Sequence, residues 1–175
     1  MKRITVALAG NPNSGKSTVF NALTGSRQHV GNWPGKTVER KFGRFTHNGS
    51  SIEVTDLPGA YSLTAFSEEE SIARDFILEG KSDIVVAIVD ASNLERNLYL
   101  VTQILELQAR MILALNKCDK ADKLGYEIDM KALSDLLVGV PVIRMVALRG
   151  EGIQELRNTI VRLAKHLIDT GSDPI

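Results

Sequence analysis

Hydrophobic residues fall into two patterns that alternate along the chain. Short runs rich in β-branched residues predict strands, and segments with apolar residues at every third or fourth position predict helices. Six strands are expected, at residues 4–9, 38–46, 51–56, 84–90, 111–115 and 140–146. Five helices are expected, at residues 16–24, 68–79, 94–107, 130–137 and 153–168. This alternation predicts a three-layer α/β fold, with helices on both faces of a mostly parallel sheet.

Strand 38–46 differs from the others because its polar and apolar residues alternate. His47-Asn48-Gly49 joins it to the next strand, and Asn-Gly is the strongest short signal for a β-hairpin. We therefore expect this pair to be antiparallel, with residues 38–46 as the one antiparallel edge strand of a six-stranded sheet. The apolar stripes of the helices at 94–107 and 153–168 indicate packing against the core rather than a groove for a partner.

Composition narrows the class of protein. A length of 175 residues suits a single domain, which we place at residues 1–170, followed by a frayed tail at 171–175. Lys and Arg together number 21, as do Asp and Glu, and the resulting zero net charge argues against a nucleic-acid partner. The single cysteine suits a reducing compartment, and no apolar run is long enough to cross a bilayer. We expect a soluble cytoplasmic chain without a signal peptide.

A phosphate-binding loop is the clearest motif of the chain. The segment from Gly10 to Ser17 matches G-x-x-x-x-G-K-[ST] and lies between a predicted strand and a predicted helix, as that motif requires. Its backbone N–H groups and the helix N-terminus attract phosphate oxygens, and Gly15 lets the backbone approach closely. Lys16 would reach the β- and γ-phosphates, and Ser17 would bind Mg²⁺. The expected nucleotide contacts in this loop are Gly10, Asn11, Pro12, Asn13, Ser14, Gly15, Lys16, Ser17 and Thr18.

A second motif, Asn116-Lys117-Cys118-Asp119, follows strand 111–115 and specifies the base. The Asp119 carboxylate can accept hydrogen bonds from N1–H and N2–H₂ of guanine, a pair that adenine lacks, so an ATPase or nucleotide kinase is disfavoured. Asn116 would support the base edge and hold the loops together, and the stem of Lys117 would cover the base. Cys118 is interpreted as a small loop residue without a redox role.

The last strand is followed by a third segment of the base site. Val146, Ala147 and Leu148 are expected to contact the nucleotide, with the Ala147 N–H directed at guanine O6.

Two further loops carry candidate magnesium ligands. Asp56, at the end of strand 51–56, opens Asp56-Leu57-Pro58-Gly59 and is placed to hold Mg²⁺ through a water molecule. The Gly59 N–H can donate to the γ-phosphate. Thr37 would add a hydroxyl ligand while the γ-phosphate is present, with Gly35 and Lys36 as neighbouring nucleotide contacts. The expected magnesium ligands are therefore Ser17, Thr37 and Asp56.

These motifs occur in order over residues 10–148, and together they resemble the G domain of a small Ras-like GTPase. Residues 30–40, 56–63 and 92–100 resemble more narrowly the N-terminal G domain of the ferrous iron transport protein B (FeoB) family. The resemblance implies a P-loop NTPase fold and Mg²⁺-dependent GTP hydrolysis on the cytoplasmic side of a membrane. In that family a helical domain and a transmembrane iron permease follow the G domain, and the full-length protein can form oligomers. We expect neither part in this chain, which is therefore not expected to conduct iron.

The resemblance also implies a potassium site. Its ligands would be the side chain of Asn13 and the carbonyls of Gly31 and Trp33, and the ion would act as an arginine finger does. The other interpretation of Asn13 is a turn residue that bonds its own backbone. The implied catalytic set is Lys16, Asn13, Thr37 and Gly59. Trp33 itself is expected to be exposed in a mobile loop, where it could contact a partner.

Two positions depart from the family pattern. Ras-like enzymes have a water-orienting glutamine where this chain has Ala60, so we expect slow hydrolysis. Val146 stands where a serine is usual, which we expect to loosen the loop and speed GDP release. Two other functions remain open, a slow GTP/GDP-dependent binding switch that needs an external activator and an Era-like GTPase associated with ribosomes or tRNA. Finally, Glu68–Glu70 after Ser67 is interpreted as a helix start rather than an iron site.

Overall fold

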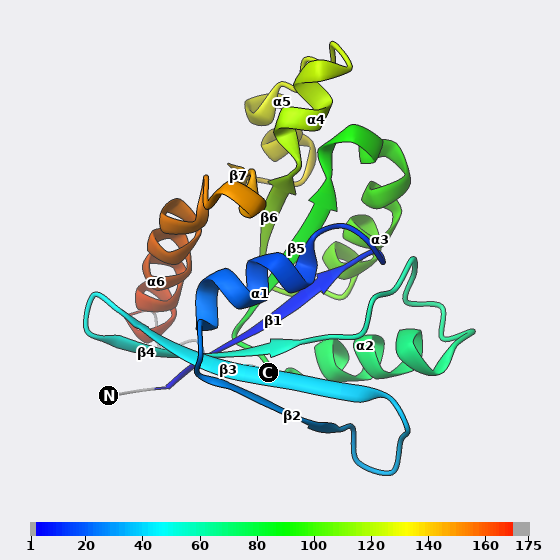
Figure 1. Ribbon diagram of the computed structural model, residues 1–175, viewed down its shortest axis with the longest axis vertical. Coiled ribbons are helices and arrows are strands. Elements are labelled where there is room, and N and C mark those ends of the chain that lie inside the picture. The colour runs from blue at the N-terminus through cyan, green and yellow to red at the C-terminus, as the bar shows by residue number, and fades with distance from the viewer. Residues whose placement is uncertain (1–2, 170–175) are drawn as a thin grey trace.

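The sheet of the computed structural model, which describes residues 3–169, confirms the expected α/β fold (Figure 1). Its seven strands lie in the order β2-β3-β4-β1-β5-β6-β7. Pairing is parallel from β4 to β7 and antiparallel between β2, β3 and β4. The strands are β1 (Ile4–Gly10), β2 (Gln28–Asn32), β3 (Glu39–His47), β4 (Ser50–Asp56), β5 (Ile84–Asp90), β6 (Met111–Asn116) and β7 (Val142–Arg144). The frayed tail predicted at 171–175 lies outside the described residues.

The hairpin between β3 and β4 forms as the sequence indicates. His47 pairs with Ser50, and Asn48 and Gly49 between them have φ of 47° and 75°. Positive φ at both central residues is what the tight hairpin turn demands, and Asn and Gly tolerate it. The prediction that residues 38–46 form the edge of the sheet is wrong, because β2 pairs with the outer side of β3. The strand β2 reads Gln-His-Val-Gly-Asn and is mostly exposed, so no apolar periodicity marks it.

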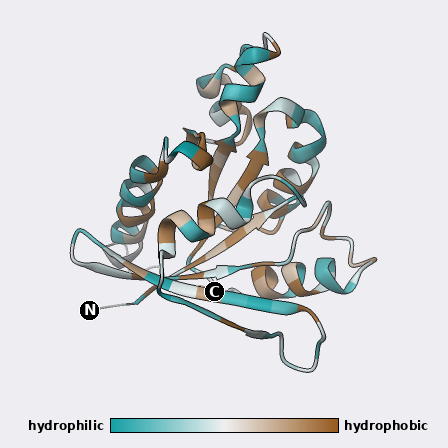
Figure 2. Cartoon of the chain, in the orientation of Figure 1, coloured by the Kyte–Doolittle hydropathy of each residue, from teal (hydrophilic) through white to brown (hydrophobic). Residues whose placement is uncertain are grey.

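The helices cover both faces of the sheet. Helices α1 (Lys16–Thr24) and α6 (Ile153–Asp169) pack on one face, while α2 (Glu68–Leu78), α3 (Leu94–Glu106), α4 (Cys118–Lys123) and α5 (Met130–Leu136) pack on the other. Apolar residues concentrate on the strands and on the inward sides of the helices (Figure 2). The stripes on α3 and α6 contribute Val101, Leu156 and Ile160 to the two cores, as expected. Among residues 3–169, no helix is both long and apolar enough to span a bilayer.

Two local predictions need correction. Helix α4 was not expected, and Cys118 is its first residue, so this cysteine is a buried helical residue rather than a loop residue. Its thiol donates to the Leu115 carbonyl at 3.0 Å, and burial raises the pKa of the thiol. The strand expected at 140–146 is shorter, because the chain after Arg144 turns into the short 3₁₀ helix η2 (Ala147–Arg149).

The parallel strands place the motifs at one edge of the sheet. Strands β1, β4, β5 and β6 run in the same direction and end at Gly10, Asp56, Asp90 and Asn116. In open α/β sheets the crevice outside these carboxyl ends is where ligands bind. The loops that follow the four strands are therefore the candidate site.

Candidate functional site

The phosphate loop is a tight turn between β1 and α1. The Ser14 N–H donates to the Asn11 carbonyl at 3.1 Å, and Asn13 and Gly15 have φ of 65° and 92°. A Cβ on Gly15 would lie 2.2 Å from Nδ2 of Asn116. Glycine is therefore required here by the neighbouring base motif as well as by its backbone conformation.

Lys16 and Asp56 meet beneath this loop. The Lys16 ammonium lies 2.5 Å from Oδ1 of Asp56, and both side chains are largely buried. Burial raises the pKa of Asp56, although the attraction of Lys16 opposes this. The Asp56 carboxylate and the exposed Ser17 hydroxyl are oxygen donors of the kind that Mg²⁺ prefers. These two residues therefore fit a magnesium site beside the phosphate loop.

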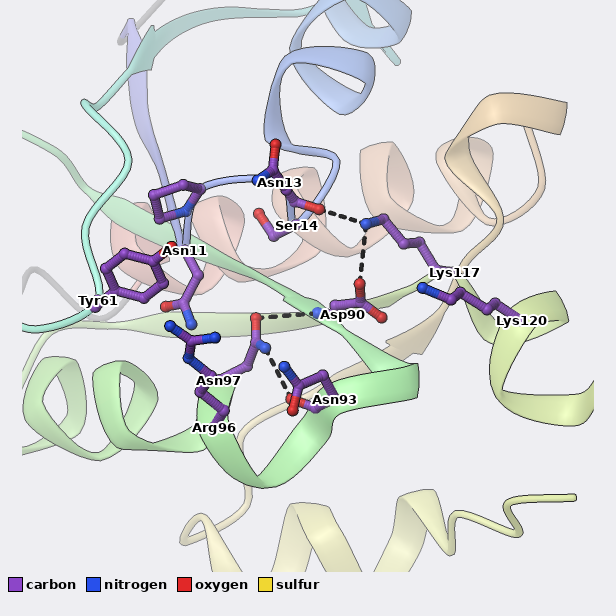
Figure 3. Close-up of a pocket in the computed structure, with 11 residues that line it drawn as sticks. Asn11, Asn13, Ser14, Tyr61, Asp90, Asn93, Arg96, Asn97, Lys117 and Lys120 are labelled. Atoms are coloured by element: carbon purple, nitrogen blue, oxygen red, sulfur yellow. Dashed lines mark hydrogen bonds and ion pairs between the residues drawn. The ribbon is translucent and has the colours of Figure 1, made fainter. Parts of the chain in front are cut away.

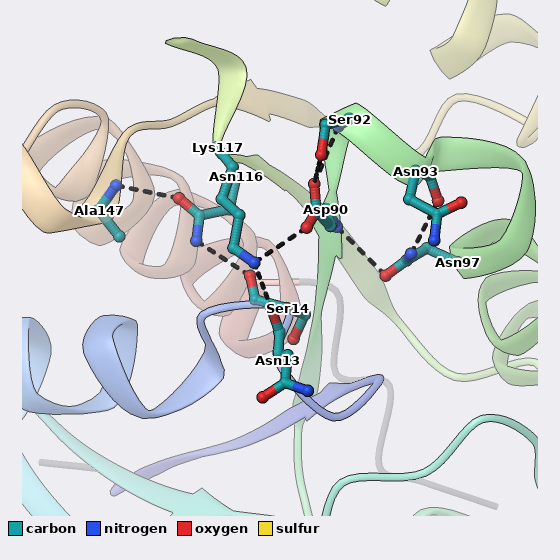
Figure 4. Close-up of polar contacts among 9 residues, drawn as sticks. All are labelled: Asn13, Ser14, Asp90, Ser92, Asn93, Asn97, Asn116, Lys117 and Ala147. Carbon is teal, nitrogen blue, oxygen red and sulfur yellow. Dashed lines mark hydrogen bonds and ion pairs between the residues drawn. The ribbon is translucent and has the colours of Figure 1, made fainter. Parts of the chain in front are cut away.

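Asn116 ties three segments of the site together (Figure 4). Its Nδ2 donates to the Ser14 carbonyl at 3.0 Å, and its Oδ1 accepts the Ala147 N–H at 2.9 Å. The side chain is only 3% exposed. The base motif, the phosphate loop and the loop after β7 are thus held by one amide, which is the bracing role expected from the sequence.

This bracing changes the expected role of Ala147. Because its N–H already donates to Asn116, the Ala147 N–H is not directed at a base in this structure, contrary to the prediction. The next N–H along the chain, that of Leu148, lies in the first turn of η2. The first hydrogen bond within this turn comes one residue later, from the Arg149 N–H to the Val146 carbonyl at 2.9 Å. First-turn N–H groups have no partner within their helix, so the Leu148 N–H remains available to a ligand.

Val146 is fixed by its neighbours. Its side chain is buried, and its N–H and carbonyl both bond the backbone of Glu151 at 3.2 Å.

A pocket of about 340 Å³ lies between these segments. The pocket is lined from the start of α1, from the base motif and from the segment around η2. The lining residues include Gly15, Thr18, Asp119, Val146, Ala147, Leu148 and Arg149. Nη2 of Arg149 lies 3.5 Å from Oδ2 of Asp119. The position of Asp119 in a pocket beside the phosphate loop suits a base whose nucleotide phosphates lie on that loop.

Lys117 is anchored by a residue that the sequence analysis missed. Its ammonium donates to Oδ2 of Asp90 at 2.9 Å and to the Asn13 carbonyl (Figure 4). Although burial opposes it, hydrogen bonds from Ser92 and Lys117 lower the pKa of Asp90. Asp90 ends the buried strand β5, as Asp56 ends β4, and this shared position is the signal that could have identified it.

A second, polar pocket of about 250 Å³ lies beyond Lys117 (Figure 3). Its walls come from the outer side of the phosphate loop, from Tyr61 after β4 and from the start of α3. The Arg96 guanidinium lies 4.7 Å from the centre of the Tyr61 ring. Within the described residues, Oδ1 of Asn11 and Oγ of Ser14 are buried without a hydrogen-bond partner. Lys117 lines both pockets, so it stands between them.

The loop expected to carry Thr37 lies away from the phosphate loop, at the turn between β2 and β3 (Figure 1). Trp33 is only 8% exposed, so the expectation of an exposed, partner-contacting tryptophan is wrong. Its ring packs edge-on against Phe76 of α2 at 5.6 Å, and the Arg40 guanidinium lies 5.0 Å from its centre. Gly35, Lys36 and Thr37 are exposed, and Lys36 reaches Glu68 at 3.5 Å.

The three candidate potassium ligands are not assembled in this arrangement. Gly31 pairs with Arg40 in the β2–β3 ladder and is no loop residue, and the Trp33 carbonyl accepts the Lys36 N–H at 2.9 Å. The phosphate loop, which carries Asn13, lies between β1 and α1 and away from the turn between β2 and β3 (Figure 1). The residues present therefore do not fit a potassium ion in this conformation.

The segment after β4 is fixed by backbone and carboxylate contacts. A Cβ on Gly59 would lie 3.3 Å from Cγ of Pro12, and the buried Ala60 donates its N–H to the Gly10 carbonyl at 3.1 Å. The Ser67 hydroxyl accepts the Glu70 N–H at 3.1 Å, which confirms the helix-start interpretation. The Glu70 carboxylate in turn accepts the Phe66 N–H at 3.1 Å.

Comparison with known proteins identifies the family. Residues 4–160 match the family model described as ferrous iron transport protein B. The Fe(2+) transporter FeoB of Escherichia coli strain K12 is 53% identical over 166 residues, which are 93% of this chain and 21% of that protein. The Salmonella typhimurium FeoB is 52% identical with the same coverage. The chain thus spans about a fifth of the length of these relatives.

Solved structures of FeoB G domains have the same fold as this chain. The G domain of the T. maritima FeoB iron transporter has a TM-score of 0.87 and 47% identity, over 93% of this chain and 99% of that one. The FeoB G domain from Methanococcus jannaschii has a TM-score of 0.83 and 50% identity, over 94% and 99% of the two chains. These likenesses favour FeoB over the Era-like alternative. The chain therefore belongs to the ferrous iron transport protein B family, in which it corresponds to the G domain.

Proposed function

We propose that this domain binds and hydrolyses GTP as the cytoplasmic regulatory part of a ferrous iron transporter. The observation that carries the proposal is the Asn116 amide, which joins the phosphate loop to the loop after β7 beside the pocket that Asp119 lines. One side of this pocket offers a carboxylate to guanine, and the other leads to the phosphate loop. Solved T. maritima FeoB cytosolic domains described as GDP and GMPPNP forms share this fold, with TM-scores of 0.90 and 0.87.

The chain's own residues account for nucleotide binding. The N-terminus of α1 and the loop N–H groups attract the phosphates, and Lys16 adds a positive charge beside them. Phosphate oxygens would compete with Asp56 for the Lys16 ammonium, which frees the carboxylate. Ser17 and Asp56 would then hold Mg²⁺, joined by Thr37 once its loop has moved. Bound Mg²⁺ neutralises charge on the β- and γ-phosphate oxygens.

Hydrolysis is expected to be slow without further help. The reaction is an in-line attack of water on the γ-phosphate, which needs a group that orients the water. Ala60 occupies the position of the Ras glutamine, and its methyl group is buried. We therefore propose an intrinsic rate on the order of 10⁻⁴ s⁻¹, as for Ras without its activator.

Potassium stimulation is part of the proposal and rests on the family resemblance. It requires Gly31 and Trp33 to leave the β2–β3 hairpin and approach Asn13. Hydrolysis in matched KCl and NaCl buffers tests it, with Asn13→Ala to remove the side-chain ligand. Asn48→Ala is the matched control because Asn48 also has positive φ and lies outside the site. Stimulation that survives in Asn13→Ala would contradict the assignment.

A slow GTP/GDP-dependent binding switch is the second candidate. Ala60 favours this candidate, because its buried methyl group cannot orient a water molecule. Single-turnover hydrolysis separates the two functions. A rate that remains near 10⁻⁴ s⁻¹ in both salts would favour the switch and an external activator.

Base recognition is tested separately. Asp119→Asn should weaken GDP binding relative to ADP and admit xanthosine diphosphate, whose C2 oxygen accepts a hydrogen bond. Unchanged competition between GDP and ADP would contradict the proposed function.

A further inference from the structure

The recognition carboxylate already has a partner within the chain. Arg149, the last residue of η2, places Nη2 3.5 Å from Oδ2 of Asp119. Both residues line the same pocket of about 340 Å³. Under the proposed function, guanine and Arg149 would therefore share the Asp119 carboxylate as their acceptor.

The two partners present similar chemistry. A guanidinium has N–H donors on two nitrogens joined through one carbon, and the N1–H and N2–H₂ edge of guanine has the same arrangement. Carboxylates accept such donor pairs side by side. The guanidinium also carries a full positive charge, which guanine does not, so Arg149 can compete with the base.

We propose that Arg149 acts as an internal competitor of guanine, occupying Asp119 until the base displaces it and thereby lowering nucleotide affinity. This inference rests on the proposed function in taking guanine as the ligand. It assigns Arg149 a role in setting how tightly the nucleotide is held, which differs from the recognition role of Asp119.

The surroundings allow Arg149 to move aside. Its side chain is 57% exposed, and Gly150 follows it with φ of 75°. Nη1 of Arg149 also lies 3.9 Å from Oε1 of Glu151, which offers a second carboxylate. The guanidinium can therefore turn from Asp119 to Glu151 without losing its ionic partner.

The size of the effect is limited by exposure. Asp119 is 29% exposed and the single contact is 3.5 Å long, so solvent screens the pair. Exposed pairs of this kind change an equilibrium by at most about fivefold. Removing the guanidinium should therefore tighten GDP binding about two- to fivefold.

The test measures GDP dissociation constants for the wild-type domain, Arg149→Gln and Arg144→Gln. Arg144 is the control because it is also a partly exposed arginine paired with an aspartate, Asp122, but does not line the pocket. We expect tighter GDP binding in Arg149→Gln alone. An unchanged or weaker affinity in that variant would overturn the inference.

A second background isolates the pair. In Asp119→Asn, probed with xanthosine diphosphate, the acceptor charge is gone, so adding Arg149→Gln should leave affinity unchanged. An equal gain in both backgrounds would show that Arg149 acts elsewhere and would refute the competition. If the wild-type domain does not prefer GDP to ADP, the proposed function fails instead. The two failures are therefore distinguishable.

Discussion

Replacing Asn116 with alanine tests how the site is held together. The substitution removes two hydrogen bonds, to the Ser14 carbonyl at 3.0 Å and from the Ala147 N–H at 2.9 Å. The side chain is buried, so water cannot fully replace either bond. Leaving a buried polar group unpaired costs about 1–3 kcal/mol, and two such groups give a loss of about 2–4 kcal/mol after partial relaxation.

Thermal unfolding without nucleotide measures this loss. For a domain of this size each kcal/mol shifts Tm by about 2–4 °C, so Asn116→Ala should unfold about 5–15 °C below the wild type. Hydrogen exchange gives a local readout, because the Ala147 N–H should lose its protection. GDP affinity should fall as well, since the phosphate loop and η2 are no longer joined.

Asn97→Ala is the matched control. Asn97 is equally buried and also makes two bonds, to the Asp90 N–H at 3.2 Å and the Asn93 carbonyl at 2.8 Å. Both bonds lie within β5–α3, so this variant should lose stability while the Ala147 N–H stays protected. If Asn116→Ala melts within about 1 °C of the wild type, or if both variants lose protection at Ala147 equally, the bracing argument is refuted.

Three further outcomes follow from burial and backbone geometry. Because burial raises the folded-state pKa of Asp56, the wild type should gain stability from this group as pH falls from neutral towards that raised pKa. Asp56→Asn should remove this pH-dependent gain while weakening Mg²⁺ binding, and a dependence of Tm on pH that is the same in this variant as in the wild type would contradict the prediction. Gly10→Ala should cost about 1–3 kcal/mol, since its Cβ would meet the Ile88 carbonyl at 2.6 Å, whereas Gly31→Ala, with nothing within 4 Å, should unfold as the wild type does. Cys118 should resist a disulfide reagent such as DTNB at pH 8 in the native domain and react at once in urea, and rapid native labelling would contradict its burial.

The buried strands and their ends were the most predictable part of the structure. Strands β5 and β6 are continuous apolar runs because both faces of the sheet are covered, and their sequences show it directly. Parallel pairing then brings the residues at the carboxyl ends together, which located Asp56 and Asn116. Asp90 satisfied the same positional rule, but it belongs to no short motif and was overlooked.

Strand β2 and the burial of Trp33 were not predicted, because both depend on contacts between segments that are distant in the sequence. β2 is held by backbone pairing to β3, which needs no apolar pattern. Trp33 is followed by Pro34 and Gly35, which suggested an exposed loop. Trp33 is buried because it packs against Phe76 on α2, and the residues around Trp33 in the sequence do not indicate that contact.

The residues from β2 to Thr37 cannot keep the observed hairpin and bind the proposed cations at the same time. While Gly31 pairs with β3 and Trp33 packs on Phe76, the turn that carries Thr37 lies away from the phosphate loop, which carries Asn13 and Ser17 (Figure 1). Releasing the Trp33–Phe76 pair alone costs about 0.5–1.5 kcal/mol beyond the buried area. A ligand shifts this balance only by binding the released form more tightly. Under the proposed function that ligand would be the triphosphate, because GDP lacks the γ-phosphate that Thr37 would approach through Mg²⁺.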